Sequence, residues 1–142
     1  MKKLLIIFGM GLLMLPGCAS VSPTTGSASS GSGSASAEKA VYKKISASEA
    51  KAIIDGDGLY IILDVRTQEE FDTGHIEGAV LLPYDQIPQK AATELPDKNA
   101  KILVYCRSGN RSATASNALI DLGYTDVSDF GGIIDWPYEI VQ

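Results

Sequence analysis

Cysteine and histidine are scarce in this chain, which has two cysteines and one histidine among 142 residues. With His75 alone and no pair of cysteines at metal-ligand spacing, the sequence offers no set of ligands for a metal site. It also has no Gly-rich phosphate loop and no dinucleotide fingerprint, so we expect no cofactor. A disulfide would have to join Cys106 to Cys18, which lies outside the predicted folded domain. We therefore expect Cys106 to be an unpaired thiol, which in an exported protein is a sign of reactivity.

Positive charge is scarce as well, since 12 basic residues stand against 17 acidic ones and the formal net charge is −5. This balance argues against a nucleic-acid partner and against tight adhesion to an anionic lipid surface. The longest apolar run, residues 4–15, is well short of the roughly 20 residues that span a bilayer. Because this run follows Lys2 and Lys3, it predicts a signal peptide rather than a membrane-spanning helix.

The residues "LPGC" at 15–18 resemble the lipobox of bacterial lipoproteins, in which cleavage precedes a cysteine that receives a diacylglycerol. The resemblance implies a signal peptide over residues 1–17 and a lipid on Cys18. Such a protein is anchored in the cell envelope, on the extracytoplasmic face of a bacterial membrane. Secretion as a free protein is the alternative. The Ser- and Gly-rich segment up to residue 39 then predicts a flexible tether, and residues 40–142 predict one folded domain.

The predicted domain has the pattern of an α/β protein with a mostly parallel sheet. Five apolar, β-branched segments predict strands, at 41–45, 60–65, 79–83, 101–106 and 125–130. Because several of these segments are continuously apolar, we expect helices on both faces of the sheet.

Three helices are predicted between these strands. The sequences "SASE" (46–49) and "TQEE" (67–70) fit the capping box, so a helix should begin at each of them. A third helix is predicted over residues 111–122, with Gly123 as its left-handed C-terminal residue. Its expected apolar face consists of Ala115, Ala118, Leu119 and Leu122.

The sequence "CRSGNRS" (106–112) lies between the fourth predicted strand and the third helix. Ligand sites of parallel sheets form in such loops. Gly109 can adopt positive φ, and backbone N–H groups at a helix N-terminus attract negative charge. These N–H groups, together with the nearby Arg107 and Arg111, would stabilise a thiolate, and the arginines would also attract an anionic substrate. Cys106 is therefore the candidate nucleophile, whereas without this loop it would be interpreted as a small buried hydrophobic residue.

Asp64 and Arg66, at the end of the second predicted strand, are interpreted as an ion pair or cap that fixes the turn into the next helix, with a direct role at the site as the alternative. Trp136 is expected to anchor the core or a lid. His75 is expected to hold a turn, and a cysteine protease is disfavoured because it would need His75 beside Cys106.

Three segments, in this order, resemble the single-domain form of the rhodanese family: "LDVRTQEEFDTGHIEGAVLLP" (63–83), "VYCRSGNRSATASNALIDLGY" (104–124) and "FGGIIDWPYE" (130–139). They cover nearly the whole predicted domain. The resemblance implies a rhodanese-like fold and a sulfurtransferase, and we expect the protein to be a monomer. A small-molecule donor such as thiosulfate would give sulfur to Cys106, and the resulting persulfide would pass it to cyanide or a thiol.

The resemblance also implies the roles of the loop. Cys106 would carry the persulfide, and backbone amides would surround its sulfur. The loop would consist of Cys106 together with Arg107, Ser108, Gly109, Asn110 and Arg111. Both arginines are candidates for selecting the donor.

Two alternatives to this function stay open. Related cysteine-dependent phosphatases place arginine after five intervening residues, where this chain has Ser112, so its loop is shorter and its pocket smaller. The phosphatase is therefore disfavoured. The other alternative is a non-catalytic module that binds sulfide or an oxyanion, or relays a persulfide.

Overall fold

The computed structural model describes residues 40–142, so the predicted signal peptide, Cys18 and the tether lie outside the described residues. The described part contains a five-stranded sheet in the order β1-β5-β4-β2-β3, and every strand pair is parallel. The strands are β1 (Lys43–Lys44), β2 (Ile61–Asp64), β3 (Ala79–Leu81), β4 (Lys101–Cys106) and β5 (Asp126–Gly132).

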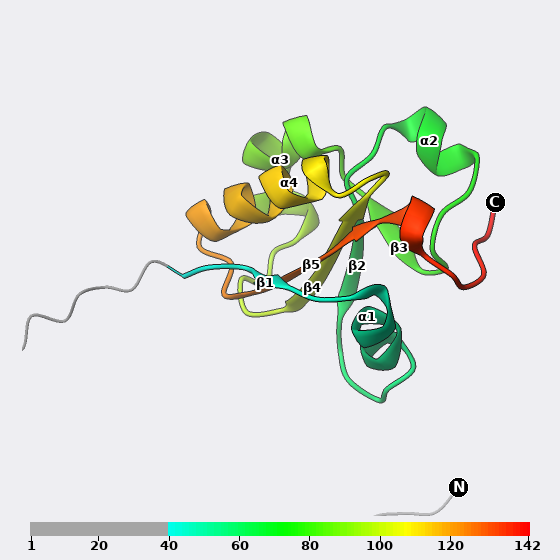
Figure 1. Ribbon diagram of the computed structural model, residues 1–142. Helices are drawn as coiled ribbons and strands as arrows, with labels where there is room; N and C mark the ends of the chain where they lie inside the picture. Colours follow the sequence, from blue (N-terminus) through cyan, green and yellow to red (C-terminus); the bar gives the residue numbers. More distant parts are fainter. Residues whose placement is uncertain (1–39) are drawn as a thin grey trace, which may run out of the picture. The chain divides into compact units, whose positions relative to one another are not determined.

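Helices cover both faces of this sheet (Figure 1). The four α-helices are α1 (Ala47–Ile54), α2 (Gln68–Asp72), α3 (Ile87–Glu94) and α4 (Asn110–Asp121). Helix α1 packs on one face, and α3 and α4 pack together on the opposite face. The predicted α/β fold with helices on both faces is confirmed, and the sheet is wholly rather than mostly parallel.

Strand β4 shows why the strand sequences are apolar at nearly every position. Val104 and Cys106 belong to the core on the α3 and α4 side, whereas Leu103 and Tyr105 belong to the core on the α1 side. All four side chains are fully buried. Alternate residues of a strand point to opposite faces, so a sheet that is covered twice needs an apolar residue at nearly every position.

Both predicted capping boxes are present. Ser46 accepts a hydrogen bond from the Glu49 backbone, and the Glu49 carboxylate accepts one from the Ser46 backbone. Thr67 and Glu70 make the same reciprocal pair at the start of α2. These bonds satisfy backbone donors that the first turn of a helix leaves free, which explains why the chain turns into a helix at these two positions.

One expectation about the helices was wrong: Leu122 lies one residue beyond the end of α4 and is 38% exposed. Helix α3 was not predicted. The buried side of α4 contains Ser112 and Ser116 beside Ala115 and Leu119, since this helix packs closely on the sheet and small side chains fit there. Within the described residues, no helix has the length and apolar character needed to cross a membrane.

Candidate active site

Cys106 is the last residue of β4, and its side chain is fully buried. The backbone N–H of Gly109 donates a hydrogen bond to its Sγ at 3.0 Å. Gly109 adopts φ of +99°, a left-handed conformation that costs glycine little, and α4 starts at the next residue. The sulfur therefore accepts a hydrogen bond from a backbone amide at a helix N-terminus, where negative charge is favoured.

The loop over residues 106–111, called the cysteine loop below, rests on the end of β5. A Cβ atom at Gly132 would lie 2.3 Å from the carbonyl oxygen of Arg107 and 2.7 Å from Cα of Ser108. Only glycine permits this approach. The backbone N–H of Ile134 also donates to the Arg107 carbonyl oxygen, at 3.3 Å. The last residue of β5 and the segment that follows it thus fix the first half of the cysteine loop.

Ser112 fixes the second half of the cysteine loop. Its Oγ is placed to donate to the carbonyl oxygens of Gly109, at 3.0 Å, and Gly131, at 3.3 Å. The Ser112 side chain is fully buried. The residue that stands where a phosphatase has arginine is therefore a buried hydroxyl that joins the loop to β5.

Arg111 differs from the expectation, because its guanidinium group is paired with a carboxylate. Nη1 and Nη2 donate to the two carboxylate oxygens of Glu70, at 2.6 and 2.8 Å. The hydrogen bond from Arg111 lowers the pKa of Glu70 from its ordinary value of 4.5 to about 2, despite partial burial. The same hydrogen bond to Glu70 raises the pKa of Arg111, although partial burial opposes this. The side chains of Arg107, Ser108 and Asn110 are exposed.

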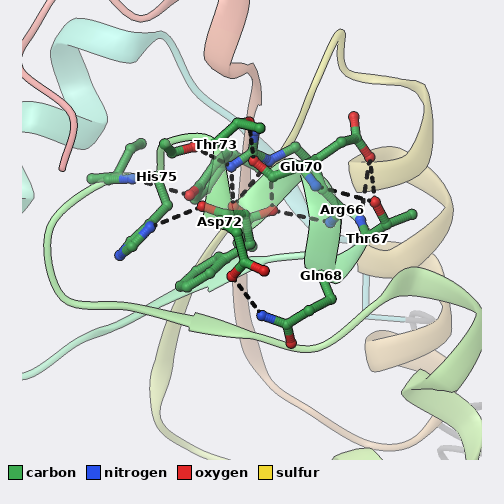
Figure 2. A network of polar contacts seen from close by, with 12 residues as sticks. Arg66, Thr67, Gln68, Glu70, Asp72, Thr73 and His75 are labelled. Carbon is green, nitrogen blue, oxygen red and sulfur yellow. Dashed lines mark hydrogen bonds and ion pairs between the residues drawn. The ribbon is translucent and has the colours of Figure 1, made fainter. Parts of the chain in front are cut away.

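Asp64 and Arg66 form the expected ion pair, and both are buried. The Arg66 guanidinium donates to both Asp64 oxygens, at 2.6 to 3.0 Å, and to the carbonyl oxygen of Gly74, at 2.8 Å. Burial opposes the charge of Arg66, but the bonds to Asp64 outweigh it and raise the Arg66 pKa. Figure 2 shows Arg66 beside the Thr67–Glu70 capping box. The pair holds the segment that contains α2, which is the structural role favoured by the sequence.

Tyr105 completes the buried polar group next to this pair. Its hydroxyl accepts a hydrogen bond from the Ile76 backbone N–H at 3.2 Å, and the Arg66 guanidinium lies 5.6 Å from the centre of its ring. Burial, helped by the nearby Asp64 carboxylate, raises the pKa of Tyr105 above its ordinary value of 10. Tyr105 is therefore a neutral hydrogen-bonding group that links β4 to the turn after α2.

The other aromatic expectations concern Trp136 and His75. Trp136 is 8% exposed and packs against Phe130, so it anchors the core on the α1 side as expected. His75 stacks on Phe71 and pairs through its backbone with Val141. In the described part of the chain, no group of three or more His, Cys, Asp or Glu side chains could hold a metal ion.

Fold and site together define a class of protein, the parallel α/β domains with a buried cysteine at a strand end whose sulfur accepts a hydrogen bond at a helix N-terminus. This arrangement suits a cysteine that acts as a nucleophile. The family model of the rhodanese-like domain matches residues 46–137. The chain belongs to the rhodanese-like domain family.

Two similar proteins of known name indicate the class of reaction, which is sulfur transfer. The thiosulfate sulfurtransferase PspE of Escherichia coli (strain K12) is 38% identical over 73 residues, which cover 51% of this chain and 70% of that protein. The structure of a rhodanese with anions from E. coli has a TM-score of 0.55 and 35% identity, and the match covers 58% of this chain and 98% of that one. These similarities support sulfurtransferase activity in general terms.

A longer relative is matched only in part. The adenylyltransferase and sulfurtransferase UBA4 of Meyerozyma guilliermondii is 33% identical over 108 residues, and the match covers 70% of this chain but 25% of that protein. This chain therefore corresponds to about a quarter of that relative.

Sequence reasoning missed four residues that shape the site. Glu70 was recognised only as a helix cap, and Ser112 only as the position where a phosphatase has arginine. Gly131 and Gly132 belong to the third segment that resembles the family, but no role was predicted for them. A pair of glycines at a strand end is a signal for close backbone approach, so Gly132 was within reach of the sequence. The partner of Glu70 was not, because Arg111 lies 41 residues further along the chain.

Proposed function

We propose that this protein transfers sulfane sulfur from a donor such as thiosulfate to cyanide or a thiol through a persulfide on Cys106. The Cys106 thiolate attacks the outer sulfur of thiosulfate. A new S–S bond forms to Cys106, the sulfur–sulfur bond of thiosulfate breaks, and sulfite leaves with the electron pair. Cyanide then attacks the outer sulfur of the persulfide, which yields thiocyanate and restores the thiolate. Charge and electrons balance in both steps, and no external oxidant is needed.

The observation that carries the proposal is the 3.0 Å hydrogen bond from the Gly109 backbone to Cys106 Sγ at the start of α4. A backbone donor aimed at the sulfur supports a thiolate before the attack. The same helix N-terminus favours the negative charge that the persulfide carries between the two steps. The names of the relatives, which include a thiosulfate sulfurtransferase, support the choice of donor.

The phosphatase alternative finds little support in the geometry. Phosphate is bound best by a guanidinium group with free donors in a fork. Arg111 gives such donors to Glu70, and the next position holds the buried Ser112. A non-catalytic module for binding sulfide or an oxyanion would use the same loop and is an outcome of the test below.

We also propose that the protein acts as a lipid-anchored monomer on the extracytoplasmic face of a bacterial membrane, with Cys18 as the lipidated residue. The support is the sequence "LPGC" at 15–18 after a short apolar run. A diacylated cysteine holds a protein at a membrane without any spanning helix. Labelling of cells with a radioactive fatty acid would detect the lipid on the wild type and none on Cys18→Ala. An unlabelled wild type would contradict the anchor.

The test of the activity measures thiocyanate formed from thiosulfate and cyanide by the purified protein. The wild type should turn over, and Cys106→Ser should show no activity above the uncatalysed rate. A parallel assay with an aryl phosphate should give no hydrolysis. Phosphate hydrolysis without thiocyanate would establish the phosphatase instead. Absence of both activities with several sulfane donors would favour the binding module.

A further inference from the structure

The ion pair between Glu70 and Arg111 joins the end of the cysteine loop to a helix from a distant part of the chain. Arg111 is the last residue of the loop and lies in the first turn of α4, whereas Glu70 lies in α2. The two guanidinium nitrogens meet the two carboxylate oxygens at 2.6 and 2.8 Å, and the side chains are only 27% and 28% exposed. Such a paired, two-point contact is strong and geometrically specific.

This contact uses the part of Arg111 that would otherwise recognise an oxyanion. Sulfate, sulfite and phosphate bind to arginine through the same pair of donors that a carboxylate uses. Arg111 and Cys106 are the two end residues of the cysteine loop, and Glu70 neutralises the positive charge of Arg111 in this ion pair.

Glu70 is itself held firmly, so an anion from solution does not displace it without further cost. Its Oε2 also accepts hydrogen bonds from the backbone N–H and the Oγ1 of Thr67, at 3.2 and 3.3 Å. Arg66 holds the two ends of this segment, because it donates hydrogen bonds to Asp64 before it and to the carbonyl oxygen of Gly74 after it. Losing the Glu70 contact to Arg111 would therefore disturb a connected set of bonds.

We propose that Glu70 is a specificity-determining positioning residue, which occupies Arg111 as an internal anion so that the cysteine loop does not retain tetrahedral oxyanions. The proposal deepens and rests on the proposed function. Sulfite, the product that leaves after the first step, then escapes readily, and inorganic sulfate or phosphate does not block the thiol. Without Glu70, Arg111 is free to bind these anions next to Cys106.

The chain provides a matched control for the capping role of Glu70. Glu49 closes the same kind of capping box at the start of α1, where its carboxylate binds Ser46. None of the hydrogen bonds or ion pairs described for Glu49 involves an arginine. Glutamine still accepts the hydrogen bond of a capping box, so Glu49→Gln reproduces the loss of a capping carboxylate's charge, and Glu70→Gln adds the loss of the carboxylate that occupies Arg111.

The experiment measures inhibition of the thiosulfate–cyanide reaction by inorganic phosphate. For Glu70→Gln, the inhibition constant of phosphate should fall about three- to tenfold, and KM for thiosulfate and kcat should both decrease because anions leave more slowly. Glu49→Gln should match the wild type in all three quantities. In an Arg111→Gln background, Glu70→Gln should no longer change the inhibition constant. Equal inhibition constants for the wild type and Glu70→Gln, or equal shifts for Glu70→Gln and Glu49→Gln, would overturn the proposal.

A second measurement does not depend on sulfur transfer. Phosphate that is bound in the cysteine loop should slow the alkylation of Cys106 by iodoacetamide. Protection should require about three- to tenfold less phosphate in Glu70→Gln than in the wild type or Glu49→Gln. If the wild type makes no thiocyanate, the proposed function fails, yet this protection still decides whether Glu70 keeps anions out. Equal protection in all three proteins would refute the role of Glu70.

Discussion

The contact between Gly132 and the cysteine loop leads to a sharp prediction for Gly132→Ala. The added Cβ would lie 2.3 Å from the Arg107 carbonyl oxygen, whereas ordinary contacts begin near 3.4 Å, so the loop must move by about 1 Å. The backbone at Gly132 has φ of −117° and ψ of 145°, which alanine adopts without strain. The clash with the loop is therefore the physical effect of this substitution.

A displacement of about 1 Å next to the reacting group can lower activity by about 100-fold. Overpacking of this kind costs about 1 to 3 kcal/mol of stability, so the variant should still fold. The assay is kcat/KM for thiosulfate and cyanide, with the melting temperature measured alongside. The control is Gly58→Ala, because a Cβ at Gly58 meets nothing within 4 Å. A Gly132→Ala variant within threefold of the wild type in kcat/KM would refute the reasoning.

Two further predictions concern ion pairs. Asp64→Asn should lower the free energy of unfolding in urea by about 3 kcal/mol, because it leaves a buried arginine without its counter-charge. Asp55→Asn, which removes an exposed pair with Lys51, should cost under about 1 kcal/mol, and equal losses would contradict this contrast. The pKa of Glu70 is depressed to about 2, so its pair with Arg111 contributes fully above the ordinary value of 4.5 and is lost as pH falls toward 2. The difference in melting temperature between the wild type and Glu70→Gln should therefore be constant from pH 7 to 5 and shrink below pH 4, and a difference that is unchanged at pH 2.5 would contradict it.

The elements that were predicted from sequence are those with strong local signals. Strand β4 has the predicted bounds, because the five residues after Lys101 are an uninterrupted apolar run that ends at a loop. Helices α1 and α2 begin where their capping boxes predict, since a capping box involves residues only three positions apart. Gly109 and Gly123 adopt the positive φ that was expected of them.

The elements that were missed depend on tertiary structure. Helix α3 has no side-chain cap and only two buried residues, Ile87 and Ala91, so its helical pattern is weak. It is stabilised by packing, and the Tyr124 hydroxyl also donates to the carbonyl oxygens of Ala91 and Leu95, at 2.8 and 2.6 Å. Contacts of this kind join residues about 30 positions apart and leave no periodic signal in the sequence.

In the site, too, the features with local sequence signals were predicted and those that depend on tertiary contacts were not. Cys106 and the glycine turn of its loop follow from local chemistry, and the structure places them at a helix N-terminus. The pairing of Arg111 with Glu70 does not follow from the sequence. The sequence shows that an arginine lies near the thiol, but it does not show which carboxylate binds that arginine. The glycine pair at 131–132 is a sequence signal for close backbone approach, but the partner of that approach depends on how β5 ends beside β4.

The most direct test of the central claim is the intact mass of the protein after incubation with thiosulfate and removal of small molecules. The account predicts that the wild type gains one sulfur atom, that cyanide removes this atom, and that Cys106→Ser gains none. A sulfur adduct of equal yield on Cys106→Ser, or no adduct on a wild type that still forms thiocyanate, would contradict a persulfide on Cys106.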